Sequence, residues 1–207
     1  MTSSQSLPHH GPAAPHVPGD LYAYPPPWDI GRPQPAFAAL AEAGAIRGRV
    51  LDASCGTGEH VLMCAALGLD VTGVDLSASA LRAAQAKARD RGLTARFLRQ
   101  DARHLAHLGE RFGTVLDCGL FHVFTDADRR LYTDSLRAAL EPGGRHFMLC
   151  FSNRQPGQWG PVRKITREEI TATFAGGWRV DSVQPAIIDI TADPAGIRAW
   201  LAVLTRT

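Results

Sequence analysis

A chain of 207 residues with 45% hydrophobic and 20% charged residues has the composition of a single globular domain that needs no disulfide or structural metal. Its formal net charge of +2, from 22 basic and 20 acidic residues, gives no electrostatic reason to expect nucleic acid or an anionic membrane as a partner. We expect a cytoplasmic protein, because no apolar run has transmembrane length and no signal-peptide pattern opens the chain.

Three units are expected along the chain. Residues 1–20 are rich in Pro, Ser, Gly and His and have few apolar side chains to bury, which predicts a disordered tail. The histidines of this tail are better explained as solvated side chains than as metal ligands, and no metal site is predicted. Residues 21–44 hold aromatic side chains among prolines and then an Ala-rich helix closed by Gly44, which predicts a lid segment and helix. Residues 45–207 are predicted to form the main domain.

Strands and helices alternate through this main domain. Five apolar segments are predicted strands: residues 49–55, 70–76, 95–101, 112–120 and 145–152. Helices are predicted between them, among them one capped by Ser77 and one running from Thr125 or Asp126 to Leu140. Alternation of this kind favours an α/β fold with a parallel sheet covered by helices on both faces. The last two predicted strands, residues 178–190 and 197–206, have no clear helix between them and should form an antiparallel hairpin.

The turn in VLDASCGTGEH is the strongest functional signal, because Gly56 and Gly58 lie where a strand passes into a helix. Glycine there permits positive φ and a close approach of the backbone to a ligand, at the strand ends where α/β sheets bind ligands. A dinucleotide site would require a third glycine two residues after Glu59, where this chain has Val61. Glu59 also places a negative charge where a pyrophosphate would bind. The pattern therefore favours a cofactor without phosphate.

Two carboxylates follow the next two strands. Asp75 ends the second strand and is well placed to accept hydrogen bonds from both hydroxyls of a ribose, although an exposed strand-end Asp is common. Asp101 ends the third strand, where it can accept from an adenine amino group while the small Ala102 leaves room for the ring. A helix N-cap is the alternative role for Asp101, and the two roles are compatible.

The segments VLDASCGTGE, VTGVDLS, RQDA and VLDCGLFH, in this order, resemble the class I S-adenosylmethionine (SAM)-dependent methyltransferases over about residues 46–152. The resemblance implies a Rossmann-like fold with a seven-stranded mixed sheet and one reversed strand. It implies that Asp52 and the glycine loop hold the methionine end of SAM, Asp75 the ribose, and Asp101 with Ala102 the adenine. The cofactor-binding residues expected are Trp28, Asp52, Ala53, Gly56, Thr57, Gly58, Asp75, Leu76, Asp101, Ala102, Asp117 and Cys118.

A finer likeness concerns PPWDIGRPQPAFAAL, GLFHVF and the PGG turn. These segments are similar to small-molecule enzymes near the halide/thiol and thiopurine methyltransferases, and to mycobacterial enzymes that methylate heterocyclic toxins. The likeness implies methylation of a thiol or acidic hydroxyl on a small aromatic or heterocyclic molecule. Methylation of RNA or protein and non-catalytic SAM binding remain as alternatives, and the oligomeric state stays open.

His122 is the candidate general base, because it follows the fourth predicted strand and its unperturbed pKa suits proton transfer near neutral pH. A structural or merely lining histidine is the alternative. Aromatic and basic side chains of the neighbouring segments could form a pocket for a flat acceptor. The substrate-binding residues expected are Tyr24, Phe121, His122, Arg154 and Trp159.

Overall fold

The computed structural model describes residues 21–22, 24–157 and 162–207. The predicted tail and Trp159 lie outside the described residues. The strands are β1 (Val50–Asp52), β2 (Val71–Asp75), β3 (Arg96–Arg99), β4 (Phe112–Cys118), β5 (Leu140–Phe151), β6 (Trp178–Ile190) and β7 (Asp193–Arg206). The helices are α1 (Pro35–Glu42), α2 (Glu59–Ala66), α3 (Ala78–Asp90), α4 (Asp126–Ala139) and α5 (Arg167–Thr173), with short 3₁₀ helices η1 (Ala102–Leu108) and η2 (Phe121–Val123).

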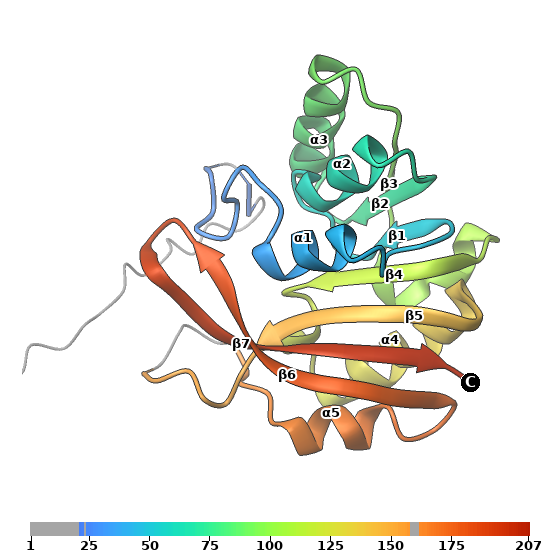
Figure 1. Ribbon diagram of the computed structural model, residues 1–207, viewed down its shortest axis with the longest axis vertical. Coiled ribbons are helices and arrows are strands. Elements are labelled where there is room, and N and C mark those ends of the chain that lie inside the picture. The colour runs from blue at the N-terminus through green and yellow to red at the C-terminus, as the bar shows by residue number, and fades with distance from the viewer. Residues whose placement is uncertain (1–20, 23, 158–161) are drawn as a thin grey trace, which may run out of the picture.

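The strands form one seven-stranded sheet in the order β3-β2-β1-β4-β5-β7-β6 (Figure 1). Strands β1 to β5 pair in parallel, whereas β7 is antiparallel to both of its neighbours. The predicted mixed sheet with one reversed strand and an antiparallel C-terminal hairpin is thus confirmed. The parallel strands all end at one edge of the sheet, where a ligand site is expected.

Local side-chain chemistry explains where the helices begin. The Ser77 hydroxyl accepts a hydrogen bond from the Ala80 amide (3.2 Å), and Thr125 forms a reciprocal capping box with Asp128. The helix predicted to reach Leu140 ends one residue earlier, at Ala139. Leu140 is already extended (ψ 150°), fully buried and paired with Phe112 of β4. Burial against the sheet, rather than the later glycines, decides this boundary.

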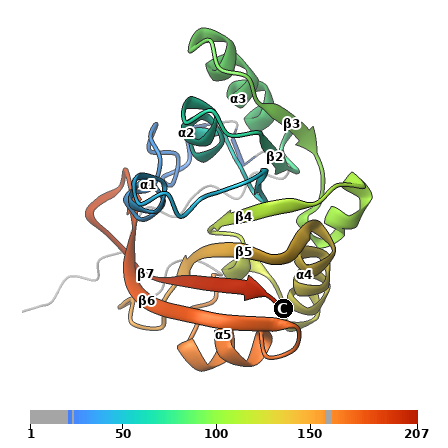
Figure 2. The same ribbon diagram turned by 45° about the vertical axis from the view of Figure 1, so that its right-hand side comes forward.

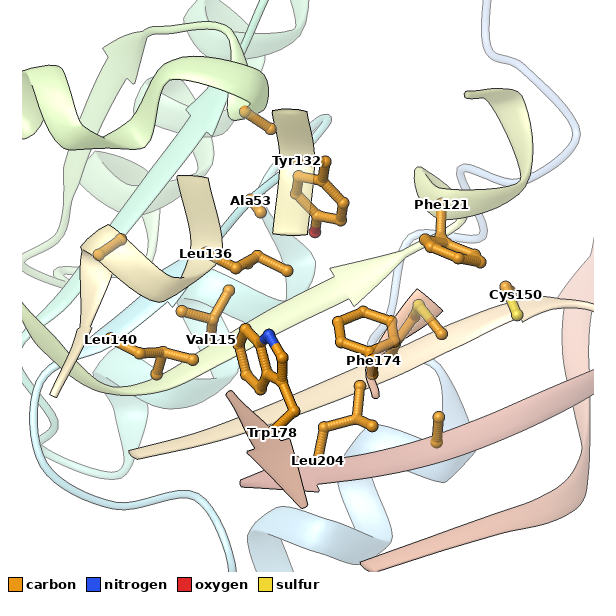
Figure 3. Close-up of a cluster of buried hydrophobic side chains, with 14 of the residues drawn as sticks. Ala53, Val115, Phe121, Tyr132, Leu136, Leu140, Cys150, Phe174, Trp178 and Leu204 are labelled. Atoms are coloured by element: carbon orange, nitrogen blue, oxygen red, sulfur yellow. The ribbon is translucent and has the colours of Figure 1, made fainter. Parts of the chain in front are cut away.

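Helices cover both faces of the sheet, as predicted (Figures 1 and 2). Side chains of α4, α5 and η1 pack on one face, and Figure 3 shows part of this cluster. Side chains of α1, α2 and α3 pack on the other face. Strand β5 supplies both layers, because Met148 and Cys150 point to the first face while Phe147 and Leu149 point to the second. Central strands buried on both sides fix the sheet's register and so the positions of the strand ends.

Candidate cofactor and acceptor site

The glycine loop after β1 has the backbone geometry that its sequence predicts. Gly56 and Gly58 have φ of 50° and 91°, in the region that favours glycine. A Cβ on Gly56 would lie 2.6 Å from the Tyr22 hydroxyl oxygen, and a Cβ on Gly58 would lie 2.8 Å from the Cβ of Ala84. Gly56 therefore admits the N-terminal segment against the loop, and Gly58 admits α3 against α2.

Gly58→Ala should lower the free energy of unfolding by about 2–5 kcal/mol. The left-handed backbone costs an L-residue about 1–2 kcal/mol, and overpacking against Ala84 adds about 1–3 kcal/mol. Gly68→Ala is the matched control, because Gly68 also has positive φ (+77°) but an added Cβ meets nothing within 4 Å. Urea unfolding compares the two variants. Equal losses would show that close packing at Gly58 contributes nothing.

Asp52 ends β1 beneath this loop. Its side chain is fully buried, and one oxygen accepts a long hydrogen bond from the Ser54 amide (3.4 Å). The other oxygen, Oδ2, has no hydrogen-bond partner and lies 3.6 Å from His60 Nδ1. Ala53, also predicted to bind the cofactor, is 2% exposed and donates its amide to the Leu116 carbonyl. A buried carboxylate oxygen without a partner favours a positively charged or hydrogen-bond-donating group nearby.

Asp75 ends β2 and contacts the glycine loop directly. Its oxygens accept hydrogen bonds from the Gly56 amide (2.9 Å) and the Ser77 amide (2.8 Å). Burial raises the pKa of Asp75, and these two backbone donors oppose that rise. Each oxygen keeps a further lone pair, so the carboxylate can still accept from hydroxyl groups. Leu76 follows as an exposed apolar side chain at the same edge.

Asp101 has the N-cap role that the sequence left as an alternative. Its carboxylate accepts from the Arg103 amide (2.9 Å) and from Arg103 Nη2 (2.6 Å). Hydrogen bonds from the Arg103 side chain lower the pKa of Asp101 more than burial raises it. An adenine amino group would share this carboxylate with Arg103. Ala102 is buried, with its carbonyl accepting from the Ser135 hydroxyl (2.7 Å).

Asp117 has a structural role that its sequence position did not reveal. The side chain is fully buried, and its oxygens accept from the Leu120 amide (2.9 Å) and the Tyr132 hydroxyl (2.9 Å). Burial raises the pKa of Asp117 to about 7, against these hydrogen bonds. The carboxylate holds the turn after β4 in place through these two hydrogen bonds. The cofactor contact expected of Asp117 stays a prediction. Cys118, the next residue, is partly exposed.

The segment before α1, residues 21–22 and 24–34, lies against the glycine loop and is called the strap below. Trp28 Nε1 donates to the Tyr22 hydroxyl (3.3 Å), and burial raises the pKa of Tyr22. Asp29 accepts from the Thr57 hydroxyl (2.9 Å). The strap also passes the turn of the β6–β7 hairpin (Figure 1), where the Thr191 amide donates to the Pro27 carbonyl (2.8 Å).

Glu59 differs from its predicted electrostatic role. Its carboxylate is buried at the start of α2 and pairs with Lys87 Nζ (2.8 Å) and Arg91 Nη1 (2.9 Å) of α3. Burial acts to raise the pKa of Glu59, but these two cations outweigh it and lower the pKa. Lys87 and Arg91 therefore compensate the negative charge, and Glu59 would not repel a pyrophosphate. Helical spacing on α3 offered no sign that Lys87 would reach the loop.

His122 lies in η2, directly after β4, and is 5% exposed. Its Nδ1 accepts a hydrogen bond from the Phe151 amide of β5 (3.2 Å), which assigns the ring proton to Nε2. Burial, with a smaller contribution from the nearby cation of Arg129, lowers the pKa of His122 to about 3. A neutral imidazole whose acceptor nitrogen is occupied is a poor general base. The arrangement instead offers Nε2–H as a hydrogen-bond donor.

The predicted acceptor residues separate into different environments. The Phe121 ring is fully buried, 5.9 Å from the Phe174 ring (Figure 3). The Arg129 guanidinium lies 4.6 Å from the centroid of the Phe121 ring. The substrate contact expected of Phe121 stays a prediction. The Arg154 guanidinium lies 5.7 Å from the Trp200 ring. Tyr24 is 75% exposed on the strap. Trp159 is outside the described residues.

Within the described ranges, no group of His, Cys, Asp and Glu side chains could hold a metal ion. No helix in the described part of the chain is long and apolar enough to cross a membrane. The features that the structure does bring together at one sheet edge are a glycine loop, two strand-end carboxylates and an aromatic strap.

Comparison with known proteins gives the family. Residues 50–144 match the model of a methyltransferase domain. The 2-heptyl-1-hydroxyquinolin-4(1H)-one methyltransferase of Mycobacteroides abscessus is 34% identical over 171 residues, which cover 81% of this chain and 75% of that protein. A probable thiol methyltransferase of Arabidopsis thaliana is 32% identical over 128 residues, covering 60% of this chain and 56% of that protein.

Solved structures agree with these relatives. A structure from work on the conversion of a disulfide bond into a thioacetal group during echinomycin biosynthesis matches with a TM-score of 0.80 and 39% identity, over 87% of this chain and 85% of that chain. The SAM-bound magnesium protoporphyrin IX methyltransferase of Synechocystis PCC 6803 shares the fold, with a TM-score of 0.65 and 20% identity over 83% of this chain and 76% of that chain. The sheet order, the matched domain and these relatives show that the chain belongs to the class I SAM-dependent methyltransferases.

Proposed function

We propose that this protein transfers the methyl group of SAM to a thiol or an acidic ring hydroxyl of a small, planar molecule. The observation that carries the proposal is the state of His122, a neutral imidazole whose Nδ1 is already occupied by the Phe151 amide. Because this histidine is a poor general base, the site suits an acceptor that loses its proton without help from an enzyme base. The names of the relatives, a hydroxyquinolinone methyltransferase and a probable thiol methyltransferase, support acceptors of this kind.

The residues present fit SAM as the methyl donor. The unpartnered Oδ2 of Asp52 suits the cationic methionine end, and the free lone pairs of Asp75 suit a ribose. Gly56 has no side chain to hinder a close approach to its backbone, and the Tyr22 hydroxyl of the strap lies over it. SAM supplies a methyl group activated by its sulfonium. The further cofactor contacts predicted from the sequence, by Thr57, Leu76, Ala102, Cys118 and Trp28, belong to the same proposal.

The protein's share of the reaction is positioning and exclusion of water. Alignment of donor and acceptor for an in-line displacement can contribute about 7–11 kcal/mol. The strap covers the glycine loop, where the half-buried Tyr22 side chain lies over Gly56 and can exclude water from it. His122 would donate from Nε2 to the acceptor's sulfur or oxygen anion and hold it in line. The exposed Tyr24 and Arg154 remain proposed acceptor contacts.

A small acceptor is favoured over RNA. The formal net charge of +2 is far from the strongly basic character of nucleic-acid-binding domains. Labelled SAM, offered with thiols, phenols, hydroxyquinolines, halide ions, RNA and protein extracts, tests the substrate class directly. We expect turnover of a thiol or a hydroxyquinoline. Preferred turnover of RNA or a protein side chain over every small acceptor would reject the proposal.

The pH dependence follows from the pKa of His122. At about 3, far below the usual 6.5, this pKa leaves His122 neutral at every pH above about 5. We therefore expect kcat/KM to rise with pH to a plateau whose midpoint follows the pKa of each acceptor in a graded phenol or thiol series. A fixed midpoint near 6–7 for all acceptors would instead indicate an enzyme base.

His122→Leu should lower kcat/KM by about 10–100-fold, the value of a hydrogen bond to a charged group. The loss should be the same at pH 6 and pH 9, because a donor acts at both. His122→Gln should recover much of the activity, since its amide can both accept from Phe151 and donate to the acceptor. A loss that disappears at alkaline pH would restore the general-base interpretation.

A further inference from the structure

Lys87 of α3 stands between the strap and the glycine loop. Its Nζ lies 2.8 Å from the Thr57 hydroxyl, 2.8 Å from Glu59 Oε1 and 4.0 Å from Asp29 Oδ1. The Thr57 hydroxyl in turn donates to Asp29 (2.9 Å). One ammonium group thus joins the strap, the glycine loop, α2 and α3, with hydrogen bonds to Thr57 and Glu59 and an ion pair with Asp29.

The charges explain why a cation is required at this point. Asp29 and Glu59 bring two carboxylates to the two sides of Thr57, and both are largely buried, with side chains 19% and 8% exposed. Arg91 pairs with Glu59 alone and makes no ion pair with Asp29 among the described residues. Lys87 is therefore the cation that lets the strap carboxylate approach the loop.

The strap has further anchors on both sides of Asp29. Arg32 pairs with Asp189 of β6 (2.7 Å), and the Gln34 amide exchanges hydrogen bonds with the Asp189 backbone (3.0 and 2.8 Å). These contacts fix the strap at its α1 end. Before Asp29, the strap is bonded to the turn of the β6–β7 hairpin through the Pro27 carbonyl (2.8 Å). These anchors tie the strap to β6 and the hairpin, whereas Asp29 ties it to the glycine loop.

We propose that Lys87 is a positioning residue that latches the strap onto the glycine loop through Asp29 and Thr57. With the latch formed, the Tyr22 hydroxyl lies over Gly56 and the cofactor loop is covered. Exchange of SAM for its demethylated product requires the Asp29–Thr57 contact to open. The role in cofactor binding rests on the proposed function, whereas the latch itself can be observed in the protein without ligand.

Lys87→Met tests the latch, with Arg91→Met as the matched control. Both variants remove one of the two cations on Glu59, but only Lys87→Met removes the contact with Asp29 and Thr57. We expect Lys87→Met to weaken binding of SAM and its demethylated product about tenfold by calorimetry, the value of one charge-assisted hydrogen bond. Proteolysis between residues 21 and 34 should become about tenfold faster. Arg91→Met should change both less than twofold.

Asp29→Asn supplies a second variant that leaves the Glu59 pair intact. It should reproduce the loss seen in Lys87→Met, and the double variant should lose no more than either single one. Equal effects of Lys87→Met and Arg91→Met, or fully additive losses in the double variant, would overturn the latch. Failure of the wild-type chain to bind SAM would reject the proposed function instead, while strap proteolysis would still decide whether the latch exists.

Discussion

Asp75→Ala should weaken SAM binding about 100-fold or more while the protein stays folded. The Asp75 carboxylate is proposed to accept from two ribose hydroxyls, and each charge-assisted hydrogen bond contributes about 1.5–3 kcal/mol. The same carboxylate fixes the Gly56 amide at 2.9 Å, so its removal also loosens the loop. Titration calorimetry with SAM measures the affinity, and circular dichroism checks the fold.

Asp70→Ala is the control for this experiment. Asp70 lies at the other end of β2, pairs with Arg49 (2.9 Å) and has a side chain that is 68% exposed. Its removal should leave SAM affinity within about twofold, because exposed ion pairs contribute little. Asp75→Asn, which keeps one acceptor oxygen, should lose less than Asp75→Ala. Wild-type affinity in Asp75→Ala would mean that Asp75 serves only to order the loop backbone.

Removal of the strap should abolish most turnover and weaken SAM binding less. A chain starting at Arg32 loses the Asp29 contact with Thr57 and the Tyr22 side chain over Gly56, but keeps the Arg32 ion pair with Asp189. The strap is proposed to exclude water and to help align the donor and the acceptor, so kcat should fall about 100-fold or more. SAM affinity should fall about tenfold, since Asp52, Asp75 and the glycine loop remain.

A chain starting at Asp20 is the matched control, because it keeps the whole strap. It should retain wild-type turnover and SAM affinity. Single-turnover assays with one thiol or hydroxyquinoline separate the effect on chemistry from the effect on binding. Equal turnover of the two shortened chains would show that the strap plays no part in catalysis.

The sequence by itself determined the features that rest on local chemistry. Alternating strand and helix patterns predicted the α/β sheet, and the lack of a helix before the last strand predicted the C-terminal hairpin. Ser77 and Thr125 marked helix starts because a hydroxyl can cap the backbone amides a few residues away. Gly56 and Gly58 marked the loop because only glycine readily adopts its positive φ. Each of these features depends on residues that are close together in the sequence, so the sequence alone can predict it.

Only the tertiary structure decided which partners surround the side chains that the sequence had singled out. The Asp117 carboxylate accepts a hydrogen bond from Tyr132, and Phe121 packs in the core. His122 accepts a hydrogen bond at Nδ1 from the Phe151 amide of the neighbouring strand, so its ring proton is on Nε2. Lys87 reaches Thr57 from thirty positions along the chain. These partners come from different elements that meet only when the sheet has formed. Burial and hydrogen bonding then set each side chain's pKa and protonation, and neither can be derived from spacing along the sequence.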